Sequence, residues 1–298
     1  MEVNRILNMI MNGSVGPVVI LVSIIIMVWY AGAVYLNSSF LIDRYEKNNI
    51  DWSFSELATD SWSMERPVLP SPHQVAKELK KSIWDKKITS KRSLVFHSGV
   101  TLSSAMLGFA MGTFLGILLS VGIVYVPALD RTLMPWIIAS QTIPILAIAP
   151  MIIVVLGSMG IVGLFPKATI STYLCFFPVV VGMVKGLRSP NIILVDLMHS
   201  YSASKAQVFW KLRMPASIPY LFASMKIAVA LSIVGSIVAE LPAGAQAGLG
   251  ARLLSGSYYG QTNLIWAALI TASIISATLV SVIGRMEQSI NNRMGLQT

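Results

Sequence analysis

Two ionisable residues lie in an apolar segment, where a charged side chain is energetically unfavourable. Lys226 is about three turns into the apolar segment 216–240, and Glu240 is its last residue. A charge deep in a membrane helix costs about 2.5 to 3.5 kcal/mol on insertion scales, so it usually faces a partner or an aqueous cavity. We therefore predict that both residues belong to a polar path or gate. The alternatives are that the long Lys226 stem snorkels to the membrane surface, and that Glu240 is a structural cap or binds a docked partner.

A proline bend and a glycine-rich loop are further candidates for this path. Pro144 interrupts the apolar stretch 133–156, because a proline removes a backbone hydrogen bond, and Gln141 puts an amide at the bend. The amide either lines the path or binds a carbonyl that the bend frees. The loop after the Glu240 segment contains Gly248 and Gly250, whose backbone freedom suits a gate or a docking surface.

The common catalytic motifs are missing from the sequence. It contains no GxxxxGK[ST] phosphate-binding loop, no HExxH and no CxxC pair. The single cysteine, Cys175, lies in an apolar segment, and the three histidines, His73, His97 and His199, lie in or beside polar stretches. We therefore expect neither an enzyme nor a metal site, and no cofactor bound by the chain itself.

Composition identifies the class of protein. Hydrophobic residues make up 55% of the 298 positions and charged residues only 12%, which a soluble domain could not tolerate on its surface. The net charge of +9 lies mostly beside apolar segments, so membrane lipids, rather than nucleic acid, are the expected partners of the basic residues. The chain is predicted to be an integral membrane protein.

Apolar length predicts an all-α, polytopic fold. About 20 residues cross the hydrocarbon core as a helix, so we expect about six transmembrane helices. We interpret the first as a retained span, with a cleaved signal peptide as the alternative. The predicted spans are 15–36, 94–125, 133–156, 168–185, 216–240 and 263–284.

The chain divides into three predicted regions: an N-terminal region with the first span (1–36), an external polar segment (37–92), and a core that holds the remaining spans (93–298). The polar segment contains an amphipathic helix after Pro72, for which an interfacial position is favoured over a separate functional domain. The basic residues of the loops place the stretch 189–215 in the cytoplasm, in agreement with the positive-inside rule.

The second span carries small residues at every fourth position. Gly108, Gly112 and Gly116 lie between Ser104 and Ser120 on one helix face. In lipid, small residues at this spacing let two helix backbones approach closely. We predict a packing face, which meets either another helix of this chain or a second copy.

The rest of the chain is organised around a polar, basic stretch between two apolar segments, Asp196–Pro215 (DLMHSYSASKAQVFWKLRMP). The small residues Ser202 and Ala203 predict a joint between two short helices, and Pro215 suits the first turn of the next span. Phe209 and Leu212 share an apolar face. Such an element either lies on the membrane surface or packs into a groove of a soluble partner.

This stretch resembles the coupling-loop signature of the permease subunits of bacterial ABC importers. The signature reads EAA, three residues, Gly, nine residues, Ile, one residue and Leu-Pro. Asp196 stands at the Glu, Ser202 at the Gly and Leu212 at the Ile, and Met214-Pro215 stand at the Leu-Pro. The spacing matches without a gap, although Leu197 and Met198 replace the two alanines and Ser202 replaces the glycine.

Four other stretches resemble the nitrate, taurine, alkanesulfonate and thiamine-precursor branch of these permeases. The resemblance extends from about Leu69 to Glu287 in the right order. The stretches are LPSP (69–72), QTIPILAIAP (141–150), MKIA (225–228) and AELPAGAQAGLG (239–250).

The resemblance implies a type I permease in the bacterial inner membrane, with a translocation path at a homodimer interface. Its partners would be an external solute-binding protein and cytoplasmic ABC ATPases that carry ATP and Mg²⁺. Phe209, Trp210 and Leu212 would be the apolar anchors of the ATPase. The residues implied in coupling are Asp196, Ser202, Ala203, Lys205, Phe209, Trp210, Leu212, Arg213 and Pro215.

The transported solute is open. The predicted path is mainly apolar and lacks a cluster of arginines, which favours a nitrogen heterocycle such as a thiamine-precursor pyrimidine over nitrate, taurine or an alkanesulfonate. A different class, the ion-gradient-driven secondary carrier, would show paired acids and bases inside the spans and inverted repeats. An intramembrane enzyme would need a polar catalytic cluster there.

Overall fold

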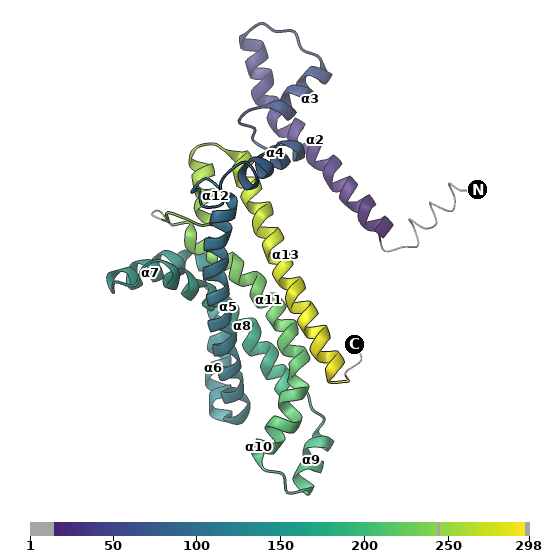
Figure 1. The fold of residues 1–298 in the computed structure, drawn as a ribbon, viewed down its shortest axis with the longest axis vertical. Coiled ribbons are helices and arrows are strands. Elements are labelled where there is room, and N and C mark those ends of the chain that lie inside the picture. The colour runs from purple at the N-terminus through teal and green to yellow at the C-terminus, as the bar shows by residue number, and fades with distance from the viewer. Residues whose placement is uncertain (1–14, 243–244, 296–298) are drawn as a thin grey trace, which may run out of the picture. The chain divides into compact units, whose positions relative to one another are not determined.

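The computed structural model describes residues 15–242 and 245–295 (Figure 1). The described residues form helices joined by short turns, without a strand. They fall into two compact units, one within Met1–Ile88 and Leu253–Ala268, the other within Thr89–Arg252 and Leu269–Thr298. The first fourteen residues of the predicted N-terminal region lie outside the described residues, as do the last three of the predicted core.

Within the described residues, five helices are long and apolar enough to cross a membrane. They are α2 (Val15–Lys47), α5 (Leu94–Tyr125), α8 (Leu164–Leu187), α11 (Met214–Glu240) with the turns before it, and α13 (Thr262–Arg293). The prediction of an all-α polytopic protein is confirmed, and the second span has its predicted bounds.

The third predicted span, 133–156, is not one helix. It consists of α6 (Pro127–Ser140) and α7 (Ile145–Ser158), which are bent by 101° relative to each other, so that they form either a broken span or a re-entrant loop. The break covers Gln141 to Pro144. Pro144, which has no N–H to donate, caps α7, whereas Pro135 and Pro150 lie inside the two helices.

The first unit contains α2, α3 (Phe54–Ser63) and α4 (Pro72–Ile83). The predicted boundary at residue 37 is wrong, since α2 continues to Lys47. The buried Asn37 explains why a polar residue does not end the helix: its amide donates to the carbonyls of Ser61 and Leu69, and its oxygen accepts from the Val68 N–H. The polar segment is therefore fastened to α2.

The predicted amphipathic helix after Pro72 is confirmed as α4. Ser71 and Gln74 form a capping box at its start, and Val75 is buried. The lysines at 77, 80 and 81 are exposed on the opposite side from Val75. Within the same unit, the Trp29 indole donates to the Pro70 carbonyl at 2.9 Å.

The second unit has its core where α5, α8 and α11 pack together. Gly108, Gly112 and Gly116 of α5 lie against α8 of the same chain, so the intramolecular interpretation of the small-residue face holds. A Cβ at Gly108 would lie 2.3 Å from the Ser171 Cβ, and one at Gly112 or Gly116 would lie 2.7 Å from Cys175 or Val179. Side chains larger than hydrogen would force these helices apart.

Candidate functional site

The predicted coupling segment forms a helix, a turn and a second helix. Helix α9 (Ile192–Ser200) begins at Asn191, whose side chain accepts from the Ile193 N–H. Helix α10 (Lys205–Val208) begins at a capping box of Ser204 and Gln207, and a π-helical turn, Phe209–Arg213, joins it to α11. The predicted pair of short helices and the first-turn position of Pro215 are confirmed.

Ser202 makes the turn between α9 and α10. Its φ is 55°, in the left-handed region that glycine adopts without strain. This is the position at which the importer signature has glycine. The serine therefore retains the turn geometry and bears a conformational cost that glycine would not.

The exposed apolar side chains of this segment lie mostly on α9. Ile192 is 69% exposed, Tyr201 is 80% exposed and Trp210 is 66% exposed. Ile193, Leu194 and Leu197 are exposed as well. We call these six side chains the α9 surface: Ile192, Ile193, Leu194, Leu197, Tyr201 and Trp210. Asp196, Ser202 and Lys205 are also exposed, whereas Ala203, Leu212, Arg213 and Pro215 are half-buried.

Phe209 does not fit its predicted role as a docking anchor. It is half-buried and packs against the hydrophobic core of the second unit, with its ring centroid 5.8 Å from that of Tyr125. The preceding Val208 is buried. The i, i+3 spacing of Phe209 and Leu212 predicted an apolar face but not what that face contacts. Phe209 connects the coupling segment to the core of the second unit.

Gln141 and Pro144 lie at the break between α6 and α7. The Gln141 amide is 3.3 Å from the Ser140 Oγ, and the Ser140 carbonyl accepts a hydrogen bond from the Tyr173 hydroxyl of α8. Thus a tyrosine, rather than the predicted glutamine, satisfies a carbonyl at the break. That Gln141 and Pro144 line a translocation path or gate stays a prediction.

Lys226 has an ionic partner within the chain. Its ammonium group pairs with the Glu287 carboxylate of α13, so the snorkelling alternative is not what the structure shows. Glu287 was not predicted as a partner, because the sixth predicted span ends at residue 284, whereas α13 continues to Arg293.

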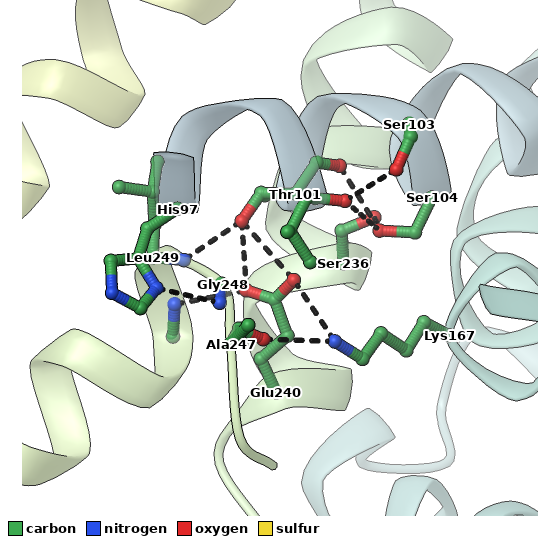
Figure 2. A network of polar contacts seen from close by, with 12 residues as sticks. His97, Thr101, Ser103, Ser104, Lys167, Ser236, Glu240, Ala247, Gly248 and Leu249 are labelled. Atoms are coloured by element: carbon green, nitrogen blue, oxygen red, sulfur yellow. Dashed lines mark hydrogen bonds and ion pairs between the residues drawn. The ribbon is translucent and has the colours of Figure 1, made fainter. Parts of the chain in front are cut away.

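Glu240 lies at the centre of a buried polar network (Figure 2). Its side chain is fully buried and accepts hydrogen bonds from the Thr101 hydroxyl at 2.9 Å and the Gly250 N–H at 3.0 Å. The Lys167 ammonium lies 3.5 Å from the carboxylate and donates to the Ala247 carbonyl at 3.0 Å. Helices α5, α8 and α11 and the start of α12 (Leu249–Tyr258) thus all meet at one carboxylate.

The same network fixes the glycine-rich loop. The Thr101 hydroxyl accepts from the Leu249 N–H at 2.8 Å, and the His97 Nδ1 accepts from the Gly248 N–H at 2.9 Å (Figure 2). The described part of this loop is therefore held by hydrogen bonds and continues into α12 (Leu249–Tyr258), and the assignment of Gly248 and Gly250 to a path or gate stays a prediction. Ala243 and Gly244 lie outside the described residues.

Comparison with known proteins identifies the family. The family described as "Binding-protein-dependent transport system inner membrane component" matches residues 112–296. The chain belongs to this family. It is accordingly a multi-pass membrane permease subunit of the ABC importer type, and its role is transport rather than catalysis.

Several curated permeases are similar to this one. The formylaminopyrimidine transport permease protein ThiX of Halalkalibacterium halodurans is 34% identical over 184 residues, which cover 61% of this chain and 68% of the relative. The riboflavin transport system permease protein RibX of Chloroflexus aurantiacus is 30% identical over 221 residues, or 74% and 78% of the two chains. The taurine transport system permease protein TauC of Escherichia coli is 26% identical over 211 residues, or 71% and 74%.

Lys167 and Thr101 are members of the permease's polar network that were not predicted from the sequence. Lys167 was assigned to a loop, because the fourth span was expected to begin at residue 168 and not at Leu164. Thr101 is an ordinary residue of an apolar helix, and its contact with Glu240 joins positions 139 residues apart. The position of Lys167 beside an apolar span is the one local signal that could have indicated a buried acidic partner.

Proposed function

We propose that this chain is the membrane subunit of an ATP-driven importer that works as a homodimer. It receives a small polar solute from an external binding protein and couples to a pair of cytoplasmic ATPases through residues 189–215. The observation that carries the proposal is the α9 surface, a set of large apolar side chains exposed beside a left-handed turn. Membership of the family supports both kinds of partner in general terms.

The α9 surface suits a protein partner. Exposed apolar patches rimmed by polar groups mark interaction sites, and aromatic residues dominate the energy of such contacts. Tyr201 and Trp210 would supply the aromatic anchors, in place of the predicted Phe209. Asp196, Lys205 and Arg213 would supply the charges that orient the partner.

The connection to the core explains how docking would move the permease. Phe209 and Val208 are packed into the second unit, and the π-helical turn runs without interruption into α11. A displacement of α9 by the ATPases would therefore pass to α11 as a rigid-body movement, which is how we expect access to alternate between the two sides of the membrane.

A nitrogen heterocycle is the proposed solute. ThiX is named for formylaminopyrimidine transport and RibX for riboflavin transport, and both compounds are nitrogen heterocycles. TauC and the putative aliphatic sulfonates permease SsuC of Bacillus subtilis, 23% identical over 223 residues, keep taurine and sulfonates as the alternative.

One observation favours a second function, the ion-gradient-driven carrier. The pairs Lys226–Glu287 and Lys167–Glu240 are acid–base pairs within the span-forming helices, as a carrier would show. The two classes differ in energy source. Uptake that persists without ATP and stops when the proton gradient is dissipated would support the carrier and contradict the ATP-driven importer.

Gentle affinity purification of the chain from its native membrane tests the coupling proposal. We expect an ABC ATPase to accompany the wild type and to be lost from Asp196→Lys and from Trp210→Ala. Trp136→Ala is the matched control, since Trp136 is a similarly exposed tryptophan on α6, and this variant should retain the ATPase. If all forms retain the same ATPase, residues 189–215 are not its docking site.

A further inference from the structure

A cavity of about 580 Å³ lies beside the Glu240 network in the second unit. This volume is within the roughly 300–1,000 Å³ typical of small-molecule sites. Helices α7, α8 and α11, the turn between α7 and α8, and the loop after α11 line it. Its apolar wall includes Ile153, Ile161, Val162, Pro166, Ala239 and Pro242.

Two polar side chains line this cavity, and neither adds an unbalanced charge. The Lys167 ammonium belongs to its wall, but the Glu240 carboxylate at 3.5 Å already neutralises that charge. The Gln246 side chain offers an amide that both donates and accepts. The cavity therefore combines apolar walls, one ammonium donor and one neutral amide.

We propose that this cavity is a solute-binding subsite of the permease and that it takes a neutral, flat nitrogen heterocycle. The inference rests on the proposed transport function and specifies its substrate class. The ring would lie against the apolar wall, and its acceptor atoms would bind the Lys167 ammonium and the Gln246 amide. A neutral solute fits because no charge is left over for it to balance.

The same charge balance disfavours taurine and sulfonates. Removing a sulfonate from water into an apolar cavity requires an uncompensated cation, and the described residues that line the cavity include no arginine and no lysine besides Lys167. Binding a sulfonate group would take the ammonium from Glu240 and leave a buried carboxylate unpaired, and the described residues that line the cavity offer no carboxylate to the ammonium group of zwitterionic taurine. The subsite thus separates the two substrate classes that the relatives represent.

The polar network around Glu240 also holds one wall of the subsite in place before the solute binds. Ala245, Gln246 and Ala247 form one wall of the cavity, and the residues that follow them are bound to Glu240, Thr101 and His97. A wall held in this way does not have to be ordered when the solute arrives, which spares the entropy of ordering it.

Cysteine protection tests the subsite directly. The one native cysteine, Cys175, is fully buried, so Ala245→Cys places an accessible thiol on the cavity wall and Ser158→Cys places one on α7 outside the cavity. Membranes from cells that produce the complete importer are treated with a methanethiosulfonate reagent, with and without formylaminopyrimidine or taurine. At ten times its dissociation constant, formylaminopyrimidine should slow labelling at Ala245→Cys about tenfold. Labelling of Ser158→Cys should not change.

Two outcomes would overturn the inference. One is protection of Ala245→Cys by taurine equal to that by formylaminopyrimidine, and the other is no protection by either compound at millimolar concentration. Co-purification of the ATPase, measured on the same membranes, reports on the proposed function separately. If the ATPase is present but neither compound protects, the subsite is wrong and the importer stands, whereas a missing ATPase contradicts the importer.

A charge variant gives an independent readout. Gln246→Lys adds a second cation beside Lys167, and Glu240 cannot neutralise both. Protection by formylaminopyrimidine should therefore fall severalfold, and protection by an anionic alkanesulfonate such as ethanesulfonate should appear. Gln246→Asn, which keeps a neutral amide, is the matched control and should retain the wild-type preference. An unchanged preference in Gln246→Lys would contradict the charge argument.

Discussion

The Glu240 carboxylate occupies the space that a side chain on residue 248 would need. A Cβ built on Gly248 would lie 2.0 Å from the Glu240 Cδ and 2.2 Å from each carboxylate oxygen. The φ of Gly248 is 125°, which also requires glycine. The close approach of backbone to carboxylate is what lets the Gly250 N–H and Leu249 N–H turn into the network.

Gly248→Ala should therefore destabilise the protein by about 3 kcal/mol, since it combines backbone strain with a steric clash in a buried site. Thermal unfolding in detergent would measure it. Gly160→Ala is the matched control: Gly160 has a φ of 79°, but a Cβ there meets nothing within 4 Å, so this variant should show only the strain of about 1 to 2 kcal/mol. Equal losses in the two variants would contradict the clash.

The ion pair of Lys167 and Glu240 should be strongly coupled. Glu240→Gln leaves the Lys167 ammonium without its charge partner, and Lys167→Met leaves the buried carboxylate without its own. Each single change should cost about 3 to 5 kcal/mol, because breaking a buried pair leaves one charge uncompensated. The double variant should be more stable than the sum of the two losses predicts. Additive losses in unfolding experiments would show that the two groups act independently.

Local sequence patterns predicted the helices of this fold better than they predicted which helices pack against each other. The N-cap serine before α5, the apolar length of that span and the proline at the start of α11 each act within a few residues, so these bounds could be read from the sequence. Small residues at every fourth position likewise predicted a packing face on α5, although only the structure shows that it meets α8.

The polar network could not be predicted, because it depends on contacts across the chain. Glu240 was a candidate from its position, but its contact with Thr101 requires α5 and α11 to pack at one register. The pairing of Lys226 with Glu287 requires α13 to continue past its apolar part. Helix ends of this kind depend on tertiary packing and not on hydropathy.

Ser202 offers a test of the turn in the coupling segment. A non-glycine residue at a φ of 55° bears about 1 to 2 kcal/mol of backbone strain, so Ser202→Gly should leave stability unchanged or raise it by about 1 kcal/mol. Ser202→Val should lower ATPase co-purification several-fold, because a β-branched residue resists the left-handed conformation. Ser200→Val, inside α9, is the control for a branched residue on the same exposed segment. Retention of the ATPase by Ser202→Val would show that docking does not depend on this turn.

The pair Lys226–Glu287 connects α11, which follows the coupling segment, to the last helix of the chain. If it serves to hold α13 to α11 as α11 moves, the order of the charges should not matter. Lys226→Glu and Glu287→Lys should each reduce uptake at least tenfold, because two like charges would face each other within a membrane helix pair. The double exchange should restore uptake to within a few-fold of the wild type. If the double exchange fails in protein that is inserted and still binds the ATPase, Lys226 or Glu287 has a role of its own, such as contact with the solute or with a transported proton. That result would favour the carrier mechanism over a pair that only attaches α13 to α11.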